Sequence, residues 1–268
     1  KKEGMKTRMF FVFNKQKIYS YCVAFGTVVI LFMLAFAVTN RNYDTVLTSG
    51  SIKEVPIYQV QTKEKKVALT LNCAWNADDI DNILKTLEEN KIKLTFFIVG
   101  DWAGKFPDAV KKIADAGHEI ANHSNTHPHV NNLSKEENKQ EIQSCSNKIE
   151  KLTGQKTILY RAPYGEYNNT VIQAAKESSH VPIQWNLDTL DYTGLTGEEM
   201  WNRINGKLNN GSIILMHNGT EHTADSLDMI IKNIQQSGYE IVTVSDLIYQ
   251  GNYRRGGNGV QKLRESSI

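Results

Sequence analysis

Apolar and polar residues are arranged in three different ways along the chain. Positions 18–38 form an uncharged run of 21 residues, positions 39–64 are polar without a sustained period, and short apolar runs alternate with amphipathic stretches from residue 65 onward. The short runs predict strands, and the stretches between them, apolar at every third or fourth position, predict helices. The predicted strands are Lys66–Ala74, Leu94–Val99, His118–Asn122, Thr157–Arg161, Val181–Leu187, Gly211–Met216 and Tyr239–Val244.

Helix-end signals fall between the predicted strands. Ser134 with Glu137 and Thr196 with Glu199 have the spacing of capping boxes. Glycines stand where helices are expected to end, at Gly117, Gly154 and Gly238. Strand–helix alternation over about 185 residues predicts parallel strands with helical crossovers, hence a barrel or a doubly wound sheet. In both architectures the chemistry gathers at the C-terminal ends of the strands.

The uncharged run 18–38 predicts a membrane anchor. As a helix it would extend about 32 Å, which is enough to cross the hydrocarbon of a bilayer. Six basic residues and one acidic residue precede it, so the positive-inside rule places segment 1–17 in the cytoplasm and the rest of the chain outside. The alternative is a signal peptide cleaved near Ala35–Ala37, which would release a secreted protein. Residues 39–64 are predicted to be a stalk and residues 249–268 a loose tail.

Charge and cysteine content exclude two classes of protein. The chain has 31 Lys and Arg against 29 Asp and Glu, and beyond the first 17 residues it has 25 basic against 28 acidic residues. This balance argues against nucleic acid as a partner. Three cysteines are too few for a disulfide scaffold, and whether Cys73 and Cys145 pair is left open. The oligomeric state is not predicted.

Two histidines four residues apart follow the third predicted strand. His123 and His127 flank a tight Ser-Asn-Thr turn, and two neutral imidazoles so placed would converge on one cation. The alternative is a polar surface loop with incidental histidines.

Three further residues follow the next three strands. Arg161 would hold a carboxylate or reach a substrate, an Asp of the run Asp188–Asp191 would orient a histidine, and His217 would lie beside them. Taken singly, each is equally explained as a surface turn, a capping residue or a packed histidine. Together they predict one active-site rim.

The ordered set of motifs resembles the NodB-homology polysaccharide deacetylases of carbohydrate esterase family four. That family's pattern is T-F-D-D, H-[ST]-x-x-H, R-x-P-x-G, D-x-x-D-W and L-x-H. The matching stretches here are Thr70–Cys73, His123–His127, Arg161–Gly165, Asp188–Tyr192 and Leu215–His217. The resemblance covers residues 65–248 and is closest to the membrane-anchored, sporulation-associated branch, which shares the N-H-S-N-T-H-P-H run and a Trp at the position of Trp75.

The resemblance implies a distorted seven-stranded (β/α) barrel, here preceded by one N-terminal transmembrane helix. It also implies hydrolysis of N-acetyl groups on N-acetylglucosamine or muramic residues of cell-wall or spore glycan, with a divalent metal, most often zinc, that polarises the acetyl carbonyl. The roles it carries over are metal ligation by His123 and His127, general-acid catalysis by His217 oriented by Asp191, orientation of the base by Arg161, oxyanion binding by the Tyr164 backbone, and substrate contact by Leu215.

The first motif departs from the family pattern. Asn72 stands at the position of the general base, and an amide cannot accept the proton of the attacking water. Cys73 stands at the position of a metal-binding Asp. Either Cys73 is a thiolate ligand of zinc, or Asp78 or Asp79 serves as ligand or base. The alternatives are a buried apolar cysteine and carboxylates in the first turn of a helix.

Three functions follow from these observations. The first is a membrane-tethered, metal-dependent deacetylase that acts outside the cytoplasmic membrane. The second is a catalytically impaired relative that binds glycan or plays a structural role, because removal of a general base costs on the order of 10²–10⁴ in rate. The third is hydrolysis of a different C–N bond at the same site.

Overall fold

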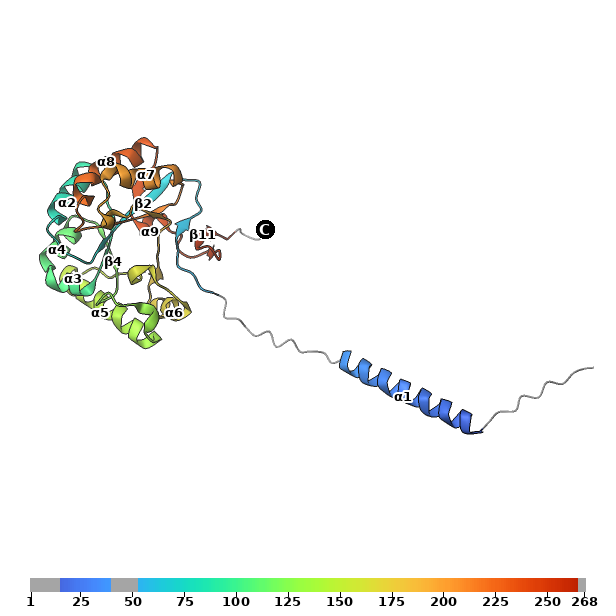
Figure 1. The fold of residues 1–268 in the computed structure, drawn as a ribbon. Coiled ribbons are helices and arrows are strands. Elements are labelled where there is room, and N and C mark those ends of the chain that lie inside the picture. The colour runs from blue at the N-terminus through green and yellow to red at the C-terminus, as the bar shows by residue number, and fades with distance from the viewer. Residues whose placement is uncertain (1–14, 40–52, 265–268) are drawn as a thin grey trace, which may run out of the picture. The chain divides into compact units, whose positions relative to one another are not determined.

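The computed structural model describes residues 15–39 and 53–264, which belong to two separate units (Figure 1). The first unit contains one helix, α1 (Lys15–Thr39). Among the described residues, no helix is long and apolar enough to cross a membrane. Helix α1 confirms that the predicted anchor segment is helical, whereas its membrane crossing stays a prediction. Most of the predicted cytoplasmic segment and the stalk up to residue 52 lie outside the described residues.

The second unit is built on a parallel sheet in the order β6-β5-β4-β3-β2-β8-β7, with β9 paired to the first half of β2. The strand at its centre, β2 (Lys66–Cys73), is longer than its neighbours. The other strands are β3 (Thr95–Ile98), β4 (Glu119–Asn122), β5 (Leu159–Tyr160), β6 (Val181–Pro182), β7 (Leu187–Asp188), β8 (Ile213–His217) and β9 (Glu240–Val242). The parallel α/β fold predicted from the alternation is confirmed.

Helices surround this sheet (Figure 1). They are α2 (Ile80–Glu89), α3 (Gly100–Lys105), α4 (Pro107–Asp115), α5 (Lys135–Thr153), α6 (Asn169–Glu177), α7 (Gly197–Ile204), α8 (Thr223–Gln236) and α9 (Val244–Leu247). Both predicted capping boxes form, at the N-termini of α5 and α7, and Gly154 ends α5 in the left-handed conformation. These local signals fix the helix ends and so the lengths of the loops that carry the site.

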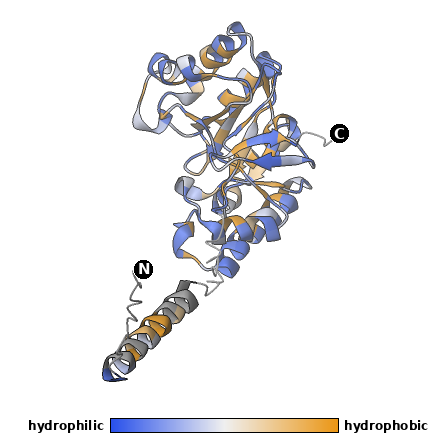
Figure 2. Ribbon diagram, turned by 90° about the vertical axis from the view of Figure 1, so that its right-hand side faces the viewer, coloured by the Kyte–Doolittle hydropathy of each residue, from blue (hydrophilic) through white to orange (hydrophobic). Residues whose placement is uncertain are grey.

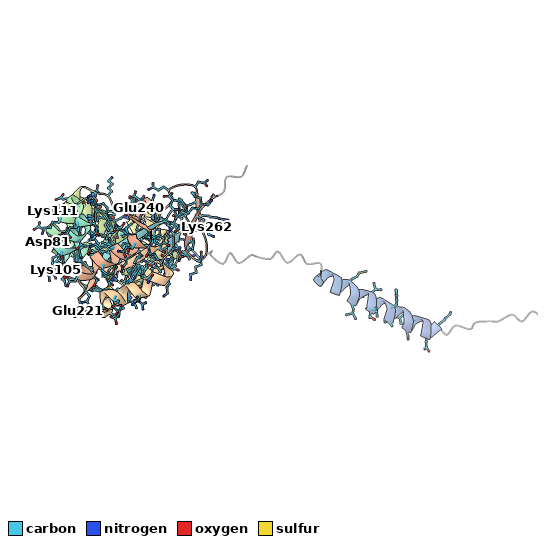
Figure 3. All side chains as sticks on the ribbon, turned by 90° about the horizontal axis from the view of Figure 1, so that it is seen from above. Asp81, Lys105, Lys111, Glu221, Glu240 and Lys262 are labelled. Carbon is cyan, nitrogen blue, oxygen red and sulfur yellow. The ribbon has the colours of Figure 1, made fainter. Side chains whose placement is uncertain are left out.

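Alternation of side chains along β2 divides the core into two layers. Val67, Leu69 and Leu71 pack against the helices in one buried cluster, whereas Ala68 belongs to a second cluster inside the curved sheet with Phe97. The strands are accordingly hydrophobic (Figure 2). Charged side chains such as the labelled Asp81, Lys111 and Lys262 lie on the outside (Figure 3).

The fifth predicted strand differs from the prediction. The run 181–187 forms two short strands, β6 and β7, so the sheet has eight strands among the described residues instead of seven. Between the two, Ile183 forms a bridge with Ile57, and Trp185 turns to line the cleft described below. The two strands stand at opposite ends of the strand order.

The predicted stalk and tail are partly wrong, because parts of both pack against the curved parallel sheet. Val60 N–H donates to the Gly211 carbonyl at 2.9 Å, and β1 (Gln59–Val60) pairs with β11 (Val260–Leu263), which pairs with β10 (Tyr253–Arg255). Ile57, Val60 and Gln261 have no exposed surface. Polar composition suggested a loose chain, but a few buried residues and the pairing of β1 with β11 hold these segments in place.

Candidate active site

The C-terminal ends of the parallel strands surround a cleft of about 470 Å³. This is the size range of small-molecule sites, and polar groups converge within it among aromatic side chains. Its lining residues are Asn72, Ala74, Trp75, His123, His127, Ala162, Tyr164, Gly165, Trp185, Asp188, Tyr192, Leu215 and His217. The cleft thus brings together predicted site residues from strands and loops far apart in sequence, namely Asn72, His123, His127, Tyr164, Leu215 and His217.

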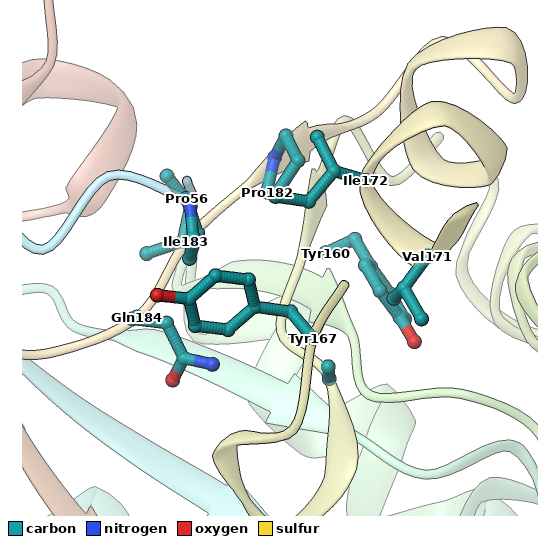
Figure 4. Close-up of a pocket in the computed structure, with 9 residues that line it drawn as sticks. Pro56, Tyr160, Tyr167, Val171, Ile172, Pro182, Ile183 and Gln184 are labelled. Atoms are coloured by element: carbon teal, nitrogen blue, oxygen red, sulfur yellow. The ribbon is translucent and has the colours of Figure 1, made fainter. Parts of the chain in front are cut away.

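A second cavity shows by contrast what this cleft offers. It lies between Tyr160, Tyr167 and Pro182 (Figure 4) and has a volume of about 10 Å³, which is enough for about one water molecule. The Tyr160 hydroxyl is buried without a hydrogen-bond partner among the described residues. Apolar walls and small size exclude this cavity as a glycan site.

At the floor of the cleft, Arg161 contacts Asn72 directly. Arg161 Nη1 donates to Asn72 Oδ1 at 2.9 Å and to Thr70 Oγ1 at 2.9 Å. Asn72 is 4% exposed and lies beside His217 in the register of β2 and β8. The Arg161 side chain therefore orients the residue at the predicted base position, which is an amide and not a carboxylate.

The surroundings of Arg161 stabilise a buried cation that no described carboxylate contacts directly. Its Cζ lies 3.8 Å from the centre of the Phe97 ring and 5.5 Å from that of Trp185, and such contacts with aromatic faces partly replace hydration. Burial lowers the pKa of Arg161 to about 9, so the guanidinium stays protonated at neutral pH. Arg161 has no ion-pair partner among the described residues, and its Nε lacks a hydrogen-bond acceptor there.

His217 and Asp191 form a histidine–carboxylate dyad. His217 Nδ1 donates to Asp191 Oδ1 at 2.8 Å, and the His217 backbone N–H donates to Asp191 Oδ2 at 2.5 Å. Asp191 is fully buried. Because Nδ1 carries the shared proton, Nε2 of His217 is left for a ligand in the cleft. The predicted orientation of His217 by Asp191 is geometrically present.

The rings of His123 and His127 lie 5.0 Å apart between their centres. His123 Nδ1 donates to the Arg161 carbonyl oxygen at 2.7 Å, which fixes the tautomer that leaves Nε2 as a donor for a metal. Burial and the neighbouring His127 lower the pKa of His123 well below its usual range, and burial also lowers the pKa of His127. Both rings are therefore neutral at pH 7, which is the form that binds metals.

The cleft offers a metal ion two side-chain ligands, His123 and His127, and no third one among the described residues. No group of three His, Cys, Asp or Glu side chains suited to a metal occurs within the part of the chain that the structure describes. The prediction that Cys73 is a ligand is wrong in this structure: Cys73 is fully buried in the cluster that faces the helices and does not line the cleft. Burial also raises the pKa of its thiol, which opposes a thiolate. Strand β2 continues through Cys73, so consecutive residues point to opposite faces.

The alternative candidates Asp78 and Asp79 also lie outside the cleft lining. Asp79 Oδ2 accepts from the Gly219 N–H at 2.7 Å and Oδ1 accepts from Asn218 Nδ2 at 3.1 Å. Asp79 stands at the N-cap position of α2. Its carboxylate therefore fixes the loop that follows His217 and replaces neither the missing base nor the missing ligand. Both cysteines of this unit, Cys73 and Cys145, are free.

Left-handed backbone conformations concentrate in the loops of the site. Ser124, His127, Tyr164 and Leu190 have φ angles of 64°, 58°, 56° and 53°. Residues with side chains adopt this region at a cost and persist there when surrounding contacts hold them. The Tyr164 ring packs between His127 and His129, with ring centres 4.6 and 4.4 Å away. The strain thus directs His127 and Tyr164 into the cleft.

Sequence reasoning did not identify two contributors to the site. Thr223, at the start of α8, donates from Oγ1 to Asp191 Oδ2 at 2.8 Å. Trp185 lines the cleft and lies over Arg161. No motif marks Thr223. Trp185 was part of a predicted continuous strand. In the structure it lies between β6 and β7, where its side chain can turn into the cleft.

Comparison with known proteins gives a consistent result. The model of the polysaccharide deacetylase family matches residues 59–182. The peptidoglycan-N-acetylglucosamine deacetylase of Bacillus cereus is 31% identical over 194 residues, which are 71% of this chain and 70% of that protein. The uncharacterized protein YlxY of Bacillus subtilis is 33% identical over 74% of this chain, which spans only 62% of that relative.

Solved structures show the same similarity. BA3943 of Bacillus anthracis, described as a CE4 family pseudoenzyme, superimposes with a TM-score of 0.70 at 33% identity, covering 72% of this chain and 68% of that one. A mutant of BA3943 described as having restored enzymatic activity gives the same TM-score and identity, with 71% of its chain covered. The B. cereus Bc1960 peptidoglycan N-acetylglucosamine deacetylase has a TM-score of 0.68 at 30% identity, over 71% of this chain and 91% of its own.

Proposed function

Because this chain belongs to the polysaccharide deacetylase family of hydrolases, we propose that its cleft binds N-acetylated cell-wall glycan and that hydrolysis of the acetyl group is held back by Asn72. The observation that carries the proposal is the bond from Arg161 Nη1 to Asn72 Oδ1, which places an amide at the base position. An amide has no lone pair basic enough to take a proton from water. The lining of the same cleft also contains the predicted residues His123, His127, Tyr164, Leu215 and His217.

Glycan binding is supported by three aromatic side chains at the mouth of the cleft. Trp75, Tyr164 and Tyr192 are 48%, 60% and 51% exposed, and all three line the cleft. Exposed rings around a polar floor are typical of ligand sites and mark surface that a partner covers. The rings of Trp75 and Tyr192 lie 5.2 and 5.4 Å from that of His217, so a sugar packed on them would place its substituent next to His217 Nε2.

The acid half of the hydrolysis is better equipped than the base half. His217, held by Asp191, is placed to protonate a leaving amine. Loss of a general base costs on the order of 10²–10⁴ in rate. The proposal therefore predicts glycan binding with slow or negligible acetate release. The BA3943 pseudoenzyme and its reactivated mutant are a precedent for an impaired relative with this fold.

The proposal includes a divalent metal ion, most often zinc in this family, with His123 and His127 as its only side-chain ligands. When bound, it would supply Lewis-acid polarisation of the acetyl carbonyl. Their neutral imidazoles suit such an ion, but the described residues provide no third side-chain donor. We therefore assign the proton transfers to the chain's own side chains.

The test is acetate release from peptidoglycan and from N-acetylglucosamine oligomers by the natural chain and by Asn72→Asp, with added zinc. We expect acetate release from the variant only, while both proteins bind the oligomers. Rapid acetate release by the natural chain would show that another residue supplies the base. It would favour the alternative that the protein is an active deacetylase, which the intact His217–Asp191 dyad supports. Ammonia release in place of acetate would show that a different C–N bond is cleaved.

The cellular location forms part of the proposal. The uncharged run 18–38 behind a basic segment supports a single-pass anchor with the deacetylase-like unit outside the membrane, facing cell-wall or spore glycan. Alkaline extraction of membranes and protease accessibility in spheroplasts test it. Release of the protein into the medium would instead support cleavage near Ala35–Ala37.

A further inference from the structure

The orientation of the Asn72 amide is fixed by chemistry. Arg161 carries only N–H donors, so the atom 2.9 Å from its Nη1 must be the amide oxygen of Asn72. The amide nitrogen, Nδ2, points away from Arg161. It forms no hydrogen bond to any residue in the described ranges. It is also not one of the polar atoms there that are buried without a partner, so it remains accessible to solvent. Since Asn72 lines the cleft, this N–H₂ group is available to a ligand.

Charge near this donor acts in the same direction. The Arg161 guanidinium lies behind Asn72 and is fully buried, and no described carboxylate forms an ion pair with it. The cleft's own carboxylate, Asp188, accepts from Leu190 N–H at 2.8 Å and from Trp185 Nε1 at 3.2 Å. The floor of the cleft at Asn72 therefore combines a free donor with a buried cation that forms no ion pair within the described residues and is balanced only in part by the Asp188 carboxylate.

We propose that this floor reads the acetylation state of the glycan: Asn72 Nδ2 donates to the carbonyl oxygen of an N-acetyl group, and the N-deacetylated sugar is rejected. The inference rests on the proposed glycan binding. A deacetylated amino sugar is an ammonium at pH 6, which has donors only, so in the position of the acetyl group it would face the Asn72 donor and the Arg161 charge, and it could pair only by moving toward Asp188 or the histidine nitrogens. A carboxylate at this position would accept from that ammonium and so tolerate the deacetylated form.

Calorimetric titration of the full chain at pH 6 with EDTA tests the inference. The ligands are the N-acetylglucosamine tetramer and the fully deacetylated glucosamine tetramer. The proteins are the natural chain, Asn72→Asp, Asn72→Ala, and Asn252→Asp as a matched control. Asn252 is exposed before β10, lies outside the cleft lining, and its side chain has no hydrogen bond within the described residues.

We expect the natural chain and Asn252→Asp to bind the acetylated tetramer at least about tenfold more tightly than the deacetylated one, because like charges brought together are strongly unfavourable. Asn72→Asp should lose this preference, and Asn72→Ala should bind the acetylated tetramer several-fold more weakly. Equal binding of both tetramers by the natural chain, or a preference unchanged in Asn72→Asp, overturns the inference and leaves glycan binding intact. Binding of neither tetramer overturns the proposed function as well.

Discussion

Asp79 and Gly219 are 140 positions apart, yet Asp79 Oδ2 accepts a hydrogen bond of 2.7 Å from the Gly219 backbone. Through this bond the loop that follows the first motif holds the loop that follows His217. Arg161 also acts by positioning its neighbours, because its guanidinium donates to Asn72, Thr70 and the Gln184 carbonyl. Asp79 and Arg161 thus serve to position loops and the Asn72 side chain around the cleft.

Asn72→Asp should stabilise the protein as well as raise acetate release. A carboxylate next to the buried Arg161 replaces a neutral acceptor by a charge-assisted one, a gain of about 1–2 kcal/mol in the free energy of unfolding at neutral pH. Because Arg161 would lower the pKa of the new carboxyl, the gain is present above the ordinary Asp pKa and is lost as the pH falls through the folded-state value. Urea denaturation at pH 7 and pH 3 measures it. A variant less stable than the natural chain at pH 7 would contradict the role given to Arg161.

In the Asn72→Asp background, His217 and Asp191 should behave as one unit. Asp191→Asn and His217→Ala are each expected to lower kcat for acetate release on the order of 10²–10⁴, and their combination should cost little more than either change alone. The reason is that Asp191 acts through the ring that it holds at 2.8 Å. Steady-state kinetics of the three variants decide the point. Multiplicative losses would mean that the two residues act separately.

Zinc binding should depend on the histidines and not on the cysteine. His123→Ala should abolish zinc bound at equilibrium, whereas Cys73→Ala should leave the zinc content unchanged. Cys73→Ala should instead lower the free energy of unfolding by about 1–2 kcal/mol, because a buried side chain leaves a cavity. Atomic absorption after dialysis and thermal denaturation provide the two measurements. Reduced zinc in Cys73→Ala would restore the thiolate ligand that the structure argues against.

Stability should fall on acidification through His118, which lies outside the site. Burial and the nearby Lys93 lower the pKa of His118 to about 4. Between pH 6.5 and pH 4 the unfolded chain binds this proton and the folded chain does not, so the free energy of unfolding decreases as the pH falls, by roughly 2 kcal/mol after solvent screening. His118→Gln, which keeps an acceptor for the Leu94 N–H, should flatten the denaturation curve in that window. An unchanged pH slope would assign the loss to other groups.

The C-terminal hairpin should contribute to stability despite its polar composition. Gln261 is fully buried, and its side chain both accepts from the Tyr249 N–H at 2.9 Å and donates to the Tyr249 carbonyl at 2.8 Å. Gln261→Ala leaves both groups without these bonds and should cost about 1–3 kcal/mol. Lys262→Ala, next in β11, is the matched control and should be near neutral. Equal thermal midpoints for both variants would mean that the tail is loose, as its composition suggests.

The sequence by itself determined the alternation of strands and helices, both capping boxes and the loops that bear the candidate side chains. These features are local: hydrophobic period, capping and strand-end position are all set within a few residues. His123 and His127 share one turn, so their proximity could be predicted. The same is true of Asn72 at the base position, because a substitution in a recognised motif needs no geometry.

Tertiary structure decided what depends on distant partners. Cys73 faces the helices because β2 runs through it, and Asp79 is held by a loop 140 residues later. The segment at Gln59 becomes a strand only because Val260 lies beside it, about 200 residues away. No local pattern encodes such pairings, since their free energy comes from surfaces that meet only after the barrel has formed. The amide at the base position could be recognised in the sequence, whereas the placement of Asp78 and Asp79 outside the cleft lining depended on the fold.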